Sequence, residues 1–140
     1  MRPPSWLRVR LPFVVLALST IALGLVVHRW GTMLTPRVRD MLGDGLWAMM
    51  IAWWLAAVFP RTALWTRGVA GLAICWAVEF SQLFHGQLLD NLRRTAAGQL
   101  VLGSGFDARD LVSYALGIIT AALLEPAIMA RLEQPIGESQ

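Results

Sequence analysis

Four long apolar segments, separated by polar stretches, dominate the pattern of the chain. They cover approximately residues 11–27, 41–59, 69–84 and 111–130. The first is uncharged throughout and reaches the lower limit of the ~17–25 residues that a membrane-spanning helix needs. The second ends at Pro60, because a residue before proline is disfavoured in a helix. We therefore predict an all-α, polytopic membrane protein with four transmembrane helices.

The first apolar segment has one alternative interpretation, a cleaved signal peptide. The apolar part of a signal peptide usually has about 7–15 residues and ends at a small-x-small site. No convincing site of this kind follows residue 27, so we favour a retained helix.

The longest connection, residues 85–109, joins the third and fourth predicted helices. It contains the sequence G-Q-L-V-L-G-S-G at 98–105, which is too short to span. We predict a re-entrant or interfacial segment here, with an ordinary surface loop as the alternative. We expect residues 1–130 to form one transmembrane domain and the polar tail 131–140 to be disordered.

The composition also favours lipid as the surrounding solvent. Apolar residues make up 56% of the chain and charged residues 15%, whereas a soluble domain has about 25% charged residues. The net charge of +3 is spread over the connections, which argues against nucleic-acid binding. Cys75 is the one cysteine and is expected to be inert.

The orientation is not decided by the positive-inside rule, because the 12 basic residues divide equally between the two sides of a four-helix arrangement. Arg2, Arg8 and Arg10 precede the first helix, and this helix often dominates. We therefore expect both termini in the cytoplasm and the protein in the cell inner membrane.

Alternation of four helices brings most polar residues to one membrane face. The start of the second helix, the end of the third, the long connection and the start of the fourth must meet there. We predict a polar, ligand-binding cavity at this face. Its candidate residues are Asp44, Trp47, Glu79, Gln82, Asp90, Arg93, Asp107, Asp110 and Tyr114.

Glu79 is the central candidate, because an ionisable residue inside a membrane-spanning segment is costly and usually functional. A buried carboxylate must find a partner or become neutral. The structural alternative is an ion pair with Arg93 or Arg94 that holds helices together, and the functional one is a binding or proton-handling carboxylate.

Three other acids have a structural alternative as helix caps. Asp44 is predicted near the start of the second helix, where it can serve as an N-cap. Asp107 and Asp110 are three residues apart at the start of the fourth helix, as in a capping box. Tyr114 lies one turn after Asp110 and is expected to hydrogen bond to a partner or a ligand.

Arg93 and Arg94 suit a phosphate or carboxylate clamp, with a headgroup-facing patch as the alternative. His28 and His85 lack the spacing of a metal site. We expect no metal and no cofactor.

Several motifs resemble a bacterial family. They are G-D-G-L-W-A at 43–48, E-F-S-Q-L at 79–83, L-D-N-L-R at 89–93, the glycine-rich run at 98–106 and D-L-V-S-Y-A-L-G at 110–117. In these motifs the chain resembles domain-of-unknown-function family 2809 and, more distantly, the VanZ-like family. The resemblance implies a small inner-membrane protein and brings no particular reaction.

Three classes of function follow from these patterns. The first, which we favour, is binding or handling of an anionic amphipathic envelope molecule, either a membrane lipid or a lipid-linked precursor. The second is an intramembrane enzyme that acts on such a lipid with Glu79 or Asp110 as general base. The third is a structural or accessory membrane subunit, in which the polar residues fasten helices.

Overall fold

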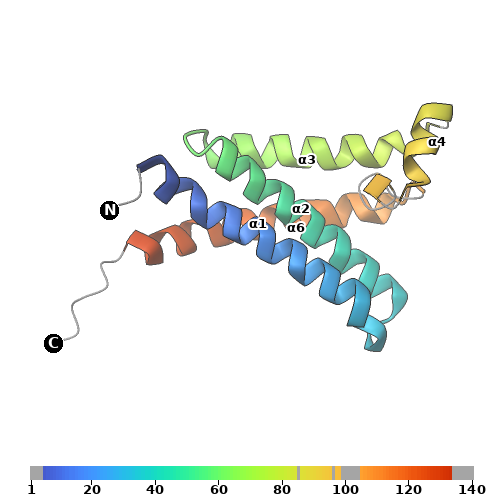
Figure 1. The fold of residues 1–140 in the computed structure, drawn as a ribbon, viewed down its shortest axis with the longest axis horizontal. Coiled ribbons are helices and arrows are strands. Elements are labelled where there is room, and N and C mark those ends of the chain that lie inside the picture. Colours follow the sequence, from blue (N-terminus) through green and yellow to red (C-terminus); the bar gives the residue numbers. More distant parts are fainter. Residues whose placement is uncertain (1–4, 85, 96, 99–104, 134–140) are drawn as a thin grey trace.

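The computed structural model describes residues 5–84, 86–95, 97–98 and 105–133, and this part of the chain is helical without strands. The long helices are α1 (Ser5–Trp30), α2 (Pro36–Val58), α3 (Leu64–Ser81) and α6 (Ala108–Glu133). Two short elements accompany them, the 3-10 turn η1 (Gly31–Met33) and α4 (Gln87–Arg93). Figure 1 shows the long helices fanning around α2 with α4 set apart from them.

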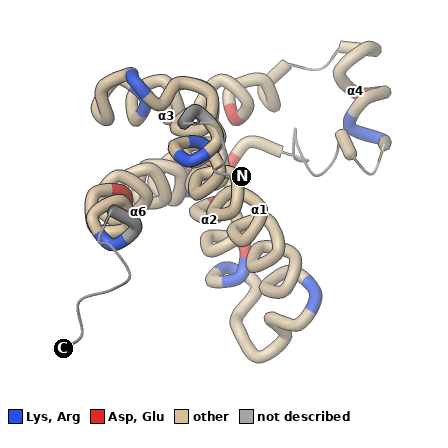
Figure 2. The backbone as a smooth tube through the Cα atoms, turned by 60° about the vertical axis from the view of Figure 1, so that its left-hand side comes forward, with Lys and Arg blue, Asp and Glu red and all other residues tan. Residues whose placement is uncertain are grey.

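Three of the long helices are long and apolar enough to cross a membrane. The candidate spans are Leu7–Met33, Pro36–Val58 and Ala108–Arg131. Charged positions lie mainly towards the ends of these helices, with long uncharged stretches between them (Figure 2). The chain is therefore a membrane-embedded helical protein, while α3, with 18 residues, falls outside these three candidates.

Successive long helices run in alternating directions. The α1–α2 turn, the end of α3, α4 and the start of α6 lie towards one end of the molecule (Figure 1). The start of α1, the α2–α3 turn and the end of α6 lie towards the other. This arrangement agrees with the predicted gathering of polar segments at one face. The predicted re-entrant segment falls mostly on residues 99–104, outside the described residues, as do tail residues 134–140, whereas 131–133 continue α6.

The start of α2 corrects the predicted role of Asp44. The helix begins eight residues earlier, at Pro36, where proline suits the first helical position. Thr35 is the N-cap, and its hydroxyl accepts a hydrogen bond from the Val38 amide at 3.4 Å. Asp44 therefore lies inside α2, and its predicted capping role is wrong.

Small residues allow α2 and α6 to cross closely. A Cβ atom built on Gly117 would overlap the Gly45 carbonyl oxygen and lie 3.0 Å from Cβ of Ala48. Close backbone approach at small residues is a general means of packing membrane helices, where van der Waals contact replaces the hydrophobic effect. The crossing fixes the start of α6 beside the first half of α2, and this contact positions the polar cavity described below.

The opposite end of the bundle contains a second buried polar contact. The third helix, predicted from the apolar segment 69–84, begins earlier than expected, because α3 starts at Leu64 and includes Arg67. Arg67 donates to Glu125 on α6 at 2.6 Å, and the two side chains are 9% and 15% exposed. Its Nε donates to the Thr62 carbonyl oxygen at 3.0 Å. This ion pair fastens α3 to α6.

We expect Arg67→Met to lower the free energy of unfolding by about 2 kcal/mol. Glu125 would lose its charged donor and would have to take up a proton or stay unpaired. Thermal unfolding in detergent, followed by circular dichroism, measures the change. The double variant Arg67→Met/Glu125→Leu should recover most of the loss, because apolar residues can replace a buried pair. A double variant no more stable than the single one would contradict this account.

Candidate functional site

A cavity of about 550 Å³ lies among the long helices, towards the end of the bundle where the polar segments meet. Residues of α1, α2, α3 and the start of α6 line it. Its volume is within the ~300–1,000 Å³ of typical small-molecule sites. The cavity exists because α1 and α2 are joined by a short turn, while α6 crosses α2 at the Gly45–Gly117 contact.

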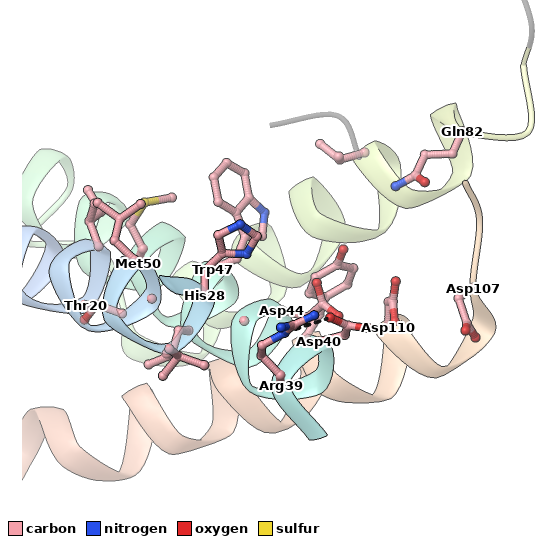
Figure 3. Close-up of a pocket in the computed structure, with 18 of the residues that line it drawn as sticks. Thr20, His28, Arg39, Asp40, Asp44, Trp47, Met50, Gln82, Asp107 and Asp110 are labelled. Atoms are coloured by element: carbon pink, nitrogen blue, oxygen red, sulfur yellow. Dashed lines mark ion pairs between the residues drawn. The ribbon is translucent and has the colours of Figure 1, made fainter. Parts of the chain in front are cut away.

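The cavity changes from polar to apolar along its length. Thr20 and Met50 lie together at one end of the close-up, and the acids with Arg39 lie towards the other (Figure 3). On α1 the lining runs from Thr20 to His28, a rise of about 12 Å. Leu25, part of this wall, is 53% exposed. The cavity therefore borders the exposed surface of α1.

Glu79 lies behind the cavity wall and is fully buried, with 0% exposure. Its carboxylate accepts three hydrogen bonds, from the Asp107 amide at 2.7 Å, from Gln82 Nε2 at 3.0 Å and from the Tyr114 hydroxyl at 3.1 Å. Within the described residues no arginine lies within ion-pair distance of it. The structural alternative, an ion pair with Arg93 or Arg94, is therefore not formed, and neutral donors take its place.

The start of α6 explains why Glu79 faces the Asp107 amide. Asp107 precedes the first helical residue, and its Oδ1 accepts from the Arg109 amide at 2.9 Å, as an N-cap does. In a capping box the third helical residue would accept from the Asp107 amide. Glu79 of α3 accepts that bond instead, and Asp110 is left free to face α2. The predicted capping role of Asp107 is confirmed.

Asp44 and Asp110 face each other across the α2–α6 crossing. Their side chains are close enough to interact electrostatically, and both line the cavity. No cation among the described side chains forms an ion pair with either acid. The neighbouring Asp40 and Asp107 differ, because they pair with Arg39 at 3.9 Å and Arg109 at 3.6 Å.

Arg93 and Asp90 lie outside the cavity lining. Arg93 donates to the Ser81 carbonyl oxygen at 2.7 Å and to the Phe84 carbonyl oxygen at 3.1 Å. It also pairs with Asp90 at 3.3 Å. Ser81 is the last residue of α3 and Phe84 lies just beyond it, a region where helix carbonyl groups lack intrahelical donors. Arg93 thus closes the end of α3 and holds α4 against it.

The nine predicted site residues divide into three groups. Six line the cavity, Glu79 supports its wall, and Asp90 and Arg93 stand apart; the six are Asp44, Trp47, Gln82, Asp107, Asp110 and Tyr114. Sequence reasoning did not select Arg39 and Asp40, which also line it. Asp40 lies one helical turn before Asp44 and therefore shares its face of the helix. This spacing is the signal that would have identified Asp40, and Arg39 is its neighbour in the chain.

The polar half of the cavity combines acidic and basic side chains. Carboxylates, the Arg39 guanidinium and the His28 imidazole offer charge of both signs. Groups of three or more metal-ligating side chains are absent from the described residues. The fold and this site define a membrane-embedded helical protein with a polar cavity at one end of its bundle.

Comparison with known families agrees with the sequence motifs. Residues 33–118 match the family model described as "Protein of unknown function (DUF2809)". This match covers more than half of the chain, so the protein belongs to that family, and the predicted resemblance to domain-of-unknown-function family 2809 is confirmed. No solved structure matches the chain. The matched residues include α2, α3 and the cavity-lining part of α6, whereas α1 lies before them.

Proposed function

We propose that this protein binds an amphipathic membrane molecule, with the phosphate-bearing headgroup in the polar half of the cavity and the hydrocarbon chain along α1. The observation that supports this most is the polarity gradient of one 550 Å³ cavity. Acids and Arg39 lie towards one end, and Thr20 and Met50 lie at the other (Figure 3). A lipid or a lipid-linked envelope precursor has the matching division of polar and apolar parts.

Arg39 is the residue we assign to the anionic group. Its Nε is buried and has no hydrogen-bond partner among the described residues, and its contact with Asp40 is long, at 3.9 Å. His28, at the end of α1, lines the same part of the cavity. A buried donor without a hydrogen bond is costly, and a phosphate oxygen would accept one from it. Arg93, the arginine expected from the sequence, is already engaged at the end of α3.

We also propose that α3 crosses the membrane as the fourth span, in the inner membrane and with both termini cytoplasmic. Its 18 residues extend over about 27 Å, close to the thickness of the hydrocarbon core. Its two costly charges are buried and paired through Arg67–Glu125 and the Glu79 hydrogen bonds. Its exposed side chains include Trp65, Val69 and Ile74, which suit contact with lipid.

The proposal is tested by filling the cavity. Gly24 lies in the wall, and a Cβ atom there would meet nothing within 4 Å. We expect Gly24→Phe to reduce the lipid retained after detergent exchange by at least about tenfold, because the ring would occupy the binding space. Native mass spectrometry measures the retained molecule, and its mass separates a phospholipid from a lipid-linked precursor.

Leu23→Phe is the matched control, because Leu23 is adjacent, 50% exposed and outside the lining. It should retain lipid as the unchanged protein does. If both variants retained as much lipid as the unchanged protein, the cavity would be excluded as the binding site. If both lost lipid equally, the loss would come from adding a large side chain to α1 and not from filling the cavity.

A further inference from the structure

The ligand's charge is constrained by the acids around the polar half of the cavity. Asp40, Asp44, Asp107 and Asp110 line it, against Arg39 and His28. Asp40 and Asp107 each have an arginine partner, at 3.9 Å and 3.6 Å. Asp44 and Asp110 have none among the described side chains and face each other instead. Two adjacent carboxylates repel unless a proton or a positive group lies between them.

Gln82 gives an independent indication of a hydrogen-bond donor in the ligand. Its side chain lines the cavity, and the residue is only 7% exposed. Nε2 donates to Glu79, but Oε1 is buried without a partner in the described structure. In the close-up the Gln82 amide extends from α3 towards the cavity (Figure 3). A buried acceptor of this kind is normally satisfied, so Oε1 is suited to accept a hydrogen bond from a ligand.

From these two observations we propose that the headgroup carries a primary ammonium group, held by Asp44 and Asp110, in addition to the phosphate near Arg39. The inference rests on the proposed function and names the class of ligand: a zwitterionic aminophospholipid. A primary ammonium has three N–H donors, enough to bridge two carboxylates and leave one for a further acceptor such as Gln82. Trp47 in the same wall offers an aromatic face, which also attracts a cation.

The test compares three phospholipids with identical acyl chains on delipidated, detergent-solubilised protein. Phosphatidylethanolamine has a primary ammonium, phosphatidylcholine has a quaternary one without N–H donors, and phosphatidylglycerol has hydroxyl groups and a net negative charge. We expect phosphatidylethanolamine to bind at least about tenfold more tightly than either of the others. Asp44→Asn and Asp110→Asn should each weaken phosphatidylethanolamine more than phosphatidylcholine and so narrow the difference in affinity between the two lipids.

Asp90→Asn is the control, because Asp90 lies on α4 outside the cavity, and circular dichroism of each variant checks its folding. Two results overturn the inference while leaving the proposed function intact. In the first, the three lipids bind equally well and Gly24→Phe still blocks their binding. In the second, the protein prefers phosphatidylglycerol. Selectivity that persists in both aspartate variants also overturns it. Binding that Gly24→Phe never affects overturns the proposed function itself, and the inference with it.

Discussion

Replacing Glu79 with alanine should lower the free energy of unfolding by roughly 3–5 kcal/mol, the largest effect expected of a single side chain here. Three donors would lose their acceptor, namely the Asp107 amide, Gln82 Nε2 and the Tyr114 hydroxyl. Each buried group left unpaired costs about 1–3 kcal/mol, and the missing side chain leaves a cavity as well. Thermal unfolding in detergent, followed by circular dichroism, measures the loss.

Glu79→Gln separates the hydrogen bonds from the volume of the side chain. Glutamine keeps the volume and one acceptor oxygen but exchanges the other for a donor, so about half of the loss is expected. Thr120→Ala serves as a control, since its exposed hydroxyl bonds only to the Leu116 carbonyl oxygen of its own helix, at 2.7 Å. If Glu79→Ala were as stable as the control, Glu79 would have no role in joining α3 to α6.

Gly117→Ala should destabilise the protein by about 3 kcal/mol or more, although alanine favours helices over glycine by about 1 kcal/mol elsewhere. The added Cβ would overlap the Gly45 carbonyl oxygen, a backbone atom that cannot rotate away. The two helices would have to separate, and overpacking of a tight contact typically costs 1–3 kcal/mol or more. The unfolding temperature in detergent measures the effect.

Gly24→Ala is the matched control for this substitution. Gly24 also lies within a helix, and an added Cβ there meets nothing within 4 Å. It should leave the protein unchanged or slightly more stable. The opposite signs expected of the two glycine-to-alanine changes distinguish the crossing contact from helix propensity, and two equal shifts would contradict the close α2–α6 packing. A Gly117→Ala variant that folds should also lose lipid retention, because the crossing positions Asp110 beside Asp44.

Much of the site was predictable because the alternation of apolar segments decides which ends of helices meet. From that rule alone we predicted that Asp44, Asp107 and Asp110 lie at one face. In the structure all three line the same cavity. It did not distinguish cavity walls from neighbouring surface. Arg93 and Asp90 lie at the correct end but face the end of α3, and the pairing of Arg67 with Glu125 joins residues 58 positions apart.

The sequence by itself determined the class of protein, its helices and the end of the bundle where its polar groups gather, because helix length and apolar content follow from local composition. Only the tertiary structure decided which groups pair. Glu79 accepts from neutral donors rather than from arginine, because the Gly45–Gly117 contact sets the start of α6 against the end of α3. The same contact turns Asp110 towards Asp44, since side-chain partners across helices depend on how closely and at what angle the backbones approach.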